Sequence, residues 1–392
     1  MHTTPGHQRL HSLDALRAWM MLLGIVLHGV LTYGTIDYGE AWPLKDRNTN
    51  IVWDLTVFTI HVFRMPVFFV LAGFFTALLV ERRGLLAMLR NRALRIGVPF
   101  VVFLLVLFPL IAAGYSYALV RIQWHGTHEA ALRAAWNAIA SVDTWQSVRT
   151  MHLWFLYYLL HFYVTVAVLR AVIPIALRDR IRDLFGALLS SRARMLVPAG
   201  ATMITLIPMR SGGLDTDPDF VIWPRTYIAY LVFFGFGYLL HAHRDRLSEF
   251  GRGAWRSTLL GLTFLVVSGA AAEAAADGTA GARALRIVAG GLATWSLVFG
   301  SIGLSLRYGG HANPRTRYVV DASYWIYLVH LPLCFWLPGL FANFDVSAIA
   351  KAPLVIAVMT PILFVSYHIL VRSTWIGTML NGRRYPLRLR SQ

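Results

Sequence analysis

Long apolar blocks, separated by charged segments, constrain this sequence more strongly than any other feature. Segments 13–31, 57–80 and 98–115 approach the length of about 20 residues that a helix needs to cross the core of a bilayer. Within lipid, a helix satisfies all of its backbone hydrogen bonds internally, whereas an open strand or a loop does not. Because 57% of the 392 residues are hydrophobic and 14% are charged, we predict an all-α polytopic membrane protein.

The apolar blocks predict about ten transmembrane helices in a single membrane-embedded domain that occupies residues 1–392. The fifth block is short and ends near Pro208. The predicted helices are 13–34, 52–80, 96–115, 153–173, 195–209, 223–241, 257–274, 286–306, 318–340 and 352–371.

The basic residues predict the orientation of the chain, because they are concentrated in alternate connecting segments. The formal net charge is +17, and five alternate segments together hold 22 arginines, whereas the other five hold 10 basic residues. The positive-inside rule then places both termini in the cytoplasm, with tails at 1–12 and 373–392. Membrane topology and contacts with lipid headgroups account for the positive charge, so no nucleic-acid partner is predicted. The arginine-rich segments are 81–95, 174–194, 242–256, 307–317 and 372–392.

The longest outer segment, 116–150, has a helical periodicity of its own. Leu132, Ala135, Trp136 and Ile139 recur at the spacing of one helix face. The pattern fits a short helix that lies on the outer surface or covers a cavity, and it fits an ordinary solvated connection equally well.

Ionisable side chains inside the apolar blocks are candidates for function, because they are costly in lipid and usually face the interior of the bundle. Arg17 and His28 lie on the first predicted helix, eleven residues or roughly 16 Å apart along its axis. Eleven residues is close to three turns, so both side chains point to the same face. His28 is then in the outer half of the bilayer; the alternative is a histidine hydrogen-bonded within a helix interface.

The second predicted helix carries His61 and Arg64, one turn apart on one face. Arg64 lies near the middle of the membrane, where a guanidinium needs an anionic partner, a water-filled cavity or an anionic substrate. A structural carboxylate is the alternative, but few acidic residues occur at that depth. Pro66 can kink the helix, and Gly73 allows close packing of a neighbouring helix.

Three arginines, Arg90, Arg92 and Arg95, stand at the cytoplasmic mouth of the third predicted helix. Arg92 and Arg95 are one turn apart and can clamp a phosphate together. The alternative is a general attraction to lipid headgroups.

Further candidates lie near the outer ends of two helices. His152 and Trp154 are at the outer boundary of the fourth predicted helix, where aromatic residues are also ordinary membrane anchors. On the ninth, Ser323, Tyr327 and His330 share one face. The predicted substrate-binding residues are His61, Arg64, His152, Trp154, Tyr327 and His330.

Four histidines thus occur at similar outer depths on four helices: His28, His61, His152 and His330. Their spacing lacks a compact zinc-ligand pattern such as HExxH, so no metal site is predicted. The arrangement suits group transfer across the bilayer, in which a phosphate-bearing donor docks on the cytoplasmic arginines and extends an arm outward. A neutral imidazole can then take the proton from an acceptor hydroxyl as it attacks a thioester.

Five motifs follow one another along the chain: LDALRAWMMLLGIVLHG, HVFRMPVFFVLAGFF, RALRIGVP, HLWFL and YLVHLPL. Together they resemble the membrane acyltransferase-3 family over nearly the whole chain, and most closely its members that succinylate osmoregulated periplasmic glucans. The resemblance implies a multi-pass protein of the bacterial inner membrane, in which 116–150 is the longest periplasmic loop. It also implies an acyl-CoA donor such as succinyl-CoA, a periplasmic glucan acceptor and no permanently bound cofactor.

The resemblance also implies roles for individual residues. Arg17 and His28 match the Arg-x10-His motif, with His28 as the essential base. Arg92 and Arg95 match an Arg-x-x-Arg motif associated with the acyl-CoA side. Arg64 and the segment that begins at His152 are implied to lie near the active site. The chain has Ala72 where the family usually has serine, which puts a role for that hydroxyl in doubt.

Two other functions fit the same residues. One is O-acetylation of another cell-envelope polysaccharide or lipid, since acceptor choice depends on the outer loops. The other is transport through the polar cavity, without covalent modification. For a succinyl donor, we hypothesise that Arg64 binds the distal carboxylate.

Overall fold

The computed structural model describes residues 5–276, 278–309 and 313–386, with side chains from residue 11 onward except that of 276. Every regular element within these ranges is a helix, which confirms the all-α prediction. The α-helices are α1 (Pro5–Val30), α2 (Ile51–Arg83), α3 (Leu85–Arg92), α4 (Val98–Ala118), α5 (His128–Ala140), α6 (Val142–Gln146), α7 (Trp154–Val172), α8 (Ile175–Ser190), α9 (Leu196–Leu206), α10 (Pro224–Ala242), α11 (Leu247–Arg252), α12 (Ala254–Ala276), α13 (Ala280–Tyr308), α14 (Pro314–Leu340), α15 (Ala348–Ser366) and α16 (Trp375–Asn381). Short 3-10 or π segments are η1 (Leu31–Tyr33), η2 (Gly39–Ala41), η3 (Ala93–Gly97), η4 (Leu119–Gln123), η5 (Met151–Leu153), η6 (Arg192–Arg194), η7 (Arg244–Arg246) and η8 (Tyr367–Val371).

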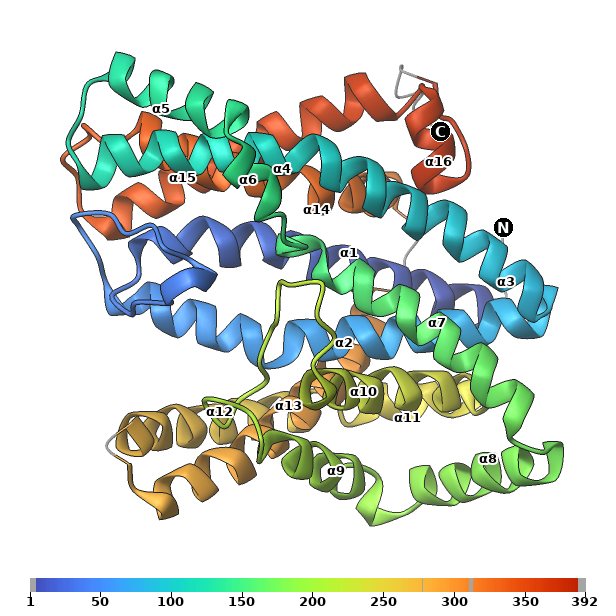
Figure 1. Cartoon of the computed structure of the whole chain (residues 1–392). Helices are drawn as coiled ribbons and strands as arrows, with labels where there is room; N and C mark the ends of the chain where they lie inside the picture. The colour runs from blue at the N-terminus through green and yellow to red at the C-terminus, as the bar shows by residue number, and fades with distance from the viewer. Residues whose placement is uncertain (1–4, 277, 310–312, 387–392) are drawn as a thin grey trace.

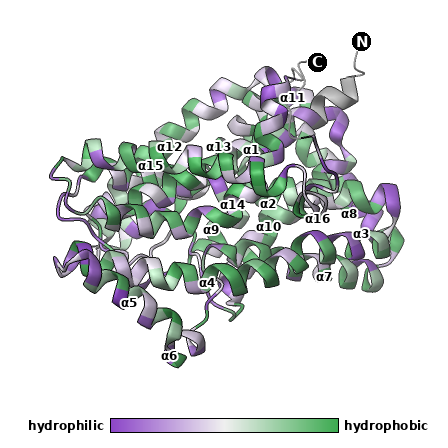
Figure 2. Cartoon of the chain, turned by 90° about the horizontal axis from the view of Figure 1, so that it is seen from above, coloured by the Kyte–Doolittle hydropathy of each residue, from purple (hydrophilic) through white to green (hydrophobic). Residues whose placement is uncertain are grey.

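Eight helical segments in the described part of the chain are long and apolar enough to cross a membrane, so the chain is a multi-pass membrane protein. Hydrophobic residues cover the middle of the bundle and hydrophilic residues gather toward its ends (Figure 2). The eight segments are His11–Tyr33, Ile51–Arg83, Leu85–Gln123, Val142–Val172, Ala254–Ala275, Ala280–Tyr308, Pro314–Leu340 and Ala348–Val371.

The predicted helices 195–209 and 223–241 correspond to α9 and α10, which are not among these eight segments. α9 has 11 residues, too few to cross a bilayer core of about 30 Å by itself. α10 has 19 residues and packs along α2. The total of about ten spans therefore stays a prediction.

The contact between α2 and α10 depends on two glycines. A Cβ atom on Gly73 would lie 1.9 Å from the carbonyl oxygen of Phe234, and one on Gly237 would lie 1.8 Å from that of Val70. Real Cβ atoms do not approach so closely, so the two backbones touch only because both positions lack a side chain. The expected close packing at Gly73 is confirmed.

α1 runs through the centre of the bundle and contacts α2, α13, α14 and α15 (Figure 1). α4, α5 and α15 lie on one side of it, and α9, α10 and α12 lie on the other (Figure 1). The start of α1 and α16 lie at the same end as α3 and α8, whereas α5 lies at the opposite end (Figure 1). We call the first of these the arginine-rich end; its location in the cytoplasm stays a prediction.

A helix forms in the segment 116–150, as one of the two alternatives predicted. α5 begins after Thr127, whose hydroxyl oxygen accepts a hydrogen bond from the backbone N–H of Ala130. The helix folds back along α4, with Ala131 and Ala135 buried and Trp136 exposed. It is therefore a packed element rather than a solvated connection.

Candidate functional site

Three histidines from distant parts of the chain meet in the half of the bundle away from the arginine-rich end. His28 near the end of α1, His330 on α14 and His152 in η5 form this histidine cluster. The Nδ1 atom of His28 lies 2.8 Å from Nε2 of His330. The centroid of the His152 ring is 5.2 Å from that of His330. His152 and His330 are buried, whereas His28 is partly exposed.

The hydrogen bonds around His330 assign the protons of the two neutral rings. Nδ1 of His330 lies 2.7 Å from the carbonyl oxygen of Tyr327 and must donate to it. In neutral imidazole the other nitrogen is then an acceptor, so Nε2 of His330 accepts from Nδ1–H of His28. Nε2 of His28 is left unprotonated, with a lone pair that can take a proton from a substrate.

His152 is fixed by hydrogen bonds to α14. Its Nε2 donates to the carbonyl of Leu328 at 2.8 Å, and the Tyr327 hydroxyl donates to the His152 carbonyl at 2.7 Å. Met151 has a φ of +50°, which is uncommon for a residue with a side chain. The buried Nδ1 of His152 accepts no hydrogen bond from the described residues. These contacts point to a segment held in a specific conformation beside the cluster.

The loop between α1 and α2 covers His28 with Trp42. The two rings are nearly parallel, with centroids 6.1 Å apart, and Trp42 also stacks on Phe335. The indole N–H of Trp42 donates to the Thr32 hydroxyl at 3.1 Å. Trp42 is therefore a wall of the site.

Carboxylates hold this loop in place. Asp54 accepts hydrogen bonds from the backbone N–H and the hydroxyl of Thr35 at 2.6 and 2.8 Å. The Tyr38 hydroxyl donates to Asp54 as well, and burial together with the charge of Asp54 raises the pKa of Tyr38. Lys351 on α15 forms a buried ion pair of 2.8 Å with Asp46. The acidic groups nearest the site thus already have partners.

Arg64 is buried against α1 between Arg17 and His28. Its Nε donates to the carbonyl of Met20 at 2.9 Å. A Cβ atom on Gly24 would lie 2.4 Å from NH2 of Arg64, so the guanidinium occupies the space that this glycine leaves. No described carboxylate forms an ion pair with Arg64, which agrees with the scarcity of acidic residues seen in the sequence.

Two predicted substrate-binding residues take other partners. Nε2 of His61 lies 2.9 Å from the carbonyl of Leu214 in the loop between α9 and α10. His61 is thus hydrogen-bonded to that loop instead of to another histidine. Trp154 is buried against Phe69 and Tyr230 in an aromatic group.

Arg17 lies on the other side of Arg64 along α1, toward the arginine-rich end. It forms an ion pair of 3.3 Å with Asp14, and its guanidinium lies over the Phe75 ring. Arg17 and Arg92 both interact electrostatically with the Tyr324 hydroxyl on α14. Arg17 and one arginine of the predicted donor clamp thus act on the same tyrosine.

Arg90 and the two clamp arginines, Arg92 and Arg95, differ in their surroundings. Arg90 is exposed, whereas the guanidinium of Arg92 lies over the Tyr163 ring and that of Arg95 is half-buried. Tyr324 donates a hydrogen bond to the backbone carbonyl of Arg95 at 3.0 Å, in the π-helical turn η3. Tyr324 thereby ties the arginine pair to α14.

A row of aromatic side chains on α14 connects the arginines with the histidine cluster. The ring centroids of Tyr324 and Tyr327 are 6.4 Å apart, and those of Tyr327 and His330 are 6.3 Å apart. On α1, Arg17 and His28 face the same way across a similar axial length. The candidate site is thus a row of side chains along α1 and α14, with cations at one end and imidazoles at the other.

Sequence reasoning missed Gly24, Trp42 and Tyr324. Gly24 carried a usable signal, because a glycine one turn before His28 allows another side chain to approach that face. Trp42 and Tyr324 carried none, because aromatic residues near membrane boundaries are common as anchors.

Comparisons with known proteins identify the family of this chain. A family model described as an acyltransferase domain, of the acyltransferase-3 type, matches residues 10–370. The chain is 28% identical over 343 residues to glucans biosynthesis protein C of Salmonella heidelberg (strain SL476), covering 83% of this chain and 82% of that protein. Glucans biosynthesis protein C of Salmonella typhi has the same identity and coverage. No solved structure matches significantly.

Proposed function

The chain belongs to the acyltransferase-3 family and is a membrane acyltransferase, and on this premise we propose that it succinylates hydroxyl groups of a periplasmic glucan. The donor is succinyl-CoA from the cytoplasm, and the protein lies in the bacterial inner membrane. The similarity to glucans biosynthesis protein C supports the acceptor class. The hydrogen bond from His28 to His330 is the observation that supports this reaction type. It leaves Nε2 of His28 unprotonated and therefore able to act as a base.

His28 acts as the general base at the thioester. Its Nε2 takes the proton of an acceptor hydroxyl while that oxygen attacks the acyl carbonyl. A C–O bond forms, the C–S bond breaks, and the proton passes from His28 to the departing thiolate. Nδ1–H of His28 continues to donate to His330 throughout, so the ring keeps its orientation.

In this proposal, different arginines bind different parts of the donor. Arg92 and Arg95, with the exposed Arg90, bind the phosphates of coenzyme A. Arg17 lies next along α1. Arg64 binds the distal carboxylate of the succinyl group, because it is a buried guanidinium whose described partner is a backbone carbonyl.

Reconstitution of the purified chain into proteoliposomes tests this function. Succinyl-CoA is supplied on one side and unmodified glucan on the other, and mass spectrometry of the glucan measures added succinate. We expect His28→Ala to insert normally and to lose at least about 100-fold in rate, as removal of a general base does. His161→Ala is the matched control, because this partly buried histidine on α7 lies outside the cluster.

Three results would contradict the proposal. Succinylation by His28→Ala at the wild-type rate would exclude His28 as the base. If the wild-type chain transferred acetyl groups and no succinyl groups, the donor would be acetyl-CoA instead of succinyl-CoA. If the donor or the glucan crossed the membrane without covalent modification, the chain would be a transporter and not an enzyme.

A further inference from the structure

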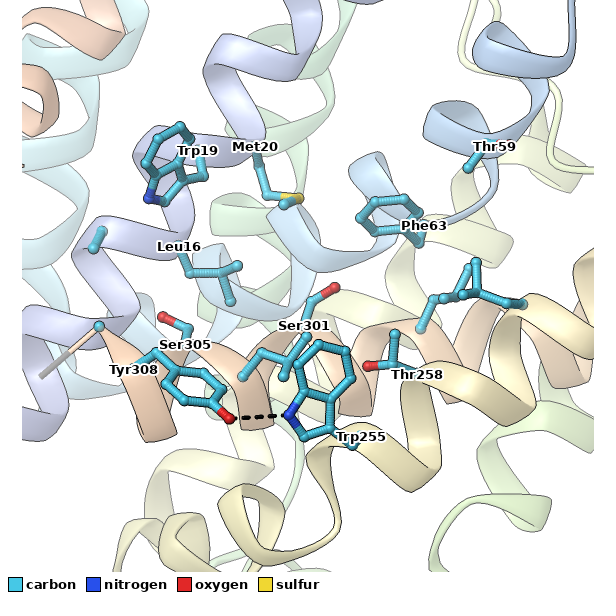
Figure 3. A pocket seen from close by; sticks show the side chains of 15 residues that line it. Leu16, Trp19, Met20, Thr59, Phe63, Trp255, Thr258, Ser301, Ser305 and Tyr308 are labelled. Carbon is cyan, nitrogen blue, oxygen red and sulfur yellow. Dashed lines mark hydrogen bonds between the residues drawn. The ribbon is translucent and has the colours of Figure 1, made fainter.

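An open groove lies beside α1 (Figure 3). Its volume is about 610 Å³, and its walls come from α1, α2, α12 and α13. Leu16, Trp19 and Met20 form the α1 wall, and Phe63 lies on the α2 wall. The lining is mostly apolar, and none of its fifteen residues is acidic. The groove takes no part in the proposed reaction.

The depth of the groove matches one leaflet of a bilayer. Along α13 its lining extends from Tyr308 to Leu297, eleven residues or roughly 16 Å apart. The hydrocarbon core of a bilayer is about 30 Å thick, so this length is close to half of it. Tyr308 is the last residue of α13, at the arginine-rich end. The groove therefore runs from that edge of the membrane-spanning region toward its middle.

The edge of the groove carries groups that bind lipid headgroups. The indole N–H of Trp255 donates to the Tyr308 hydroxyl at 3.0 Å, and both side chains are at least half exposed (Figure 3). The guanidinium of Arg307 lies over the Tyr308 ring, 5.5 Å from its centroid. Amphipathic aromatic rings favour the headgroup level, and arginine there attracts anionic lipid. Apolar walls that end in an aromatic pair and an arginine are complementary to a phospholipid with a net negative charge.

We propose that this groove binds one acyl chain of an anionic phospholipid from the leaflet at the arginine-rich end. The headgroup phosphate lies against Arg307 and the Trp255–Tyr308 pair. The lipid also supports the active region from behind, because Met20 lines the groove with its side chain and holds Arg64 with its carbonyl. This binding does not depend on which donor or acceptor the enzyme uses.

Native mass spectrometry of the full chain in detergent, with added phosphatidylglycerol or phosphatidylcholine, tests the proposal. We expect one phosphatidylglycerol molecule to stay bound more strongly than phosphatidylcholine. Arg307→Gln should weaken the binding of phosphatidylglycerol about fivefold, the effect of one arginine near the surface, and leave that of phosphatidylcholine nearly unchanged. Arg180→Gln, which removes the same charge from an exposed position on α8, should change neither.

A second variant tests the acyl chain separately from the headgroup. Ser301→Trp places a large side chain in the groove and should abolish retention of both lipids, while a single symmetric peak in size-exclusion chromatography reports that the protein is still folded. If that variant does not fold, the comparison of Arg307→Gln with Arg180→Gln still tests the proposal. Equal retention of the two lipids by the wild-type chain would overturn the proposal. Competition by glycerol phosphate as strong as that by intact phospholipid would also overturn it, because the headgroup alone would then account for binding.

Discussion

Two buried cations in this bundle are held in different ways. Lys351 on α15 is 2% exposed and forms an ion pair with Asp46, itself nearly buried, at 2.8 Å. Arg64 on α2 is 5% exposed and donates to a backbone carbonyl, with no ion pair to a described carboxylate. A buried charge without its counter-ion is costly, whereas a paired one is tolerated. The pair at Lys351 is complete in the folded chain, whereas under the proposed function Arg64 obtains its anion from the carboxylate of the succinyl group.

Removal of Lys351 should have the largest effect on stability. Lys351→Met leaves the carboxylate of Asp46 buried without its partner, which we expect to cost about 3–5 kcal/mol of unfolding free energy. The measurement is thermal unfolding of the purified chain in detergent. Lys45→Met is the matched control, because Lys45 is the other lysine of the sequence and donates to the carbonyls of Leu31 and Gly34.

The double variant Asp46→Leu/Lys351→Met sharpens this test. Two apolar side chains replace the ion pair, so most of the lost stability should return. If Lys351→Met unfolds at the temperature of Lys45→Met, the ion pair does not hold the loop between α1 and α2.

Removal of Arg64 should instead affect activity. Arg64→Met removes a charged hydrogen-bond donor from the succinyl carboxylate, an interaction of about 1.5–3 kcal/mol, so kcat/KM for succinyl-CoA should fall about 10- to 100-fold. Transfer from acetyl-CoA should fall less, because the acetyl group has no distal carboxylate. Stability should not fall, because no protein anion is left unpaired. Unchanged succinyl transfer by Arg64→Met would refute this role; Arg180→Met is the control for the loss of charge.

Replacement of His330 tests the assignment of protons in the histidine cluster. His330→Phe removes the acceptor for Nδ1–H of His28, and kcat should fall about 10-fold or more while KM for the donor stays constant. His330→Gln supplies an amide oxygen at a similar position and should restore part of kcat. If His330 only filled space, kcat of His330→Phe would be at least as high as that of His330→Gln. That ranking would show that His330 does not position His28.

The sequence was sufficient for features that depend on one helix at a time. Helical spacing placed Arg17 and His28 on one face of the continuous helix α1, whereas the depth of Arg64 in the membrane stays a prediction. It was not sufficient for contacts between distant segments. The position of Trp42 over His28 depends on Asp54 and on the Asp46–Lys351 ion pair, which join residues up to 305 positions apart. The same holds for α10, whose packing depends on two glycine contacts with α2.

A substitution at Gly24, which contacts Arg64, should have the smallest effect of those considered. It distinguishes the two buried cations because it affects Arg64 and not Lys351. Gly24→Ala adds a methyl group where NH2 of Arg64 now lies, and the flexible end of that side chain must shift. We expect KM for succinyl-CoA to rise several-fold and kcat for acetyl-CoA to change little, because only the carboxylate contact moves. Gly235→Ala on α10 is the control, since a Cβ there meets no atom within 4 Å. Combined with Arg64→Met, Gly24→Ala should have no further effect on succinyl transfer, and an additive loss would mean that Gly24 acts through His28 instead.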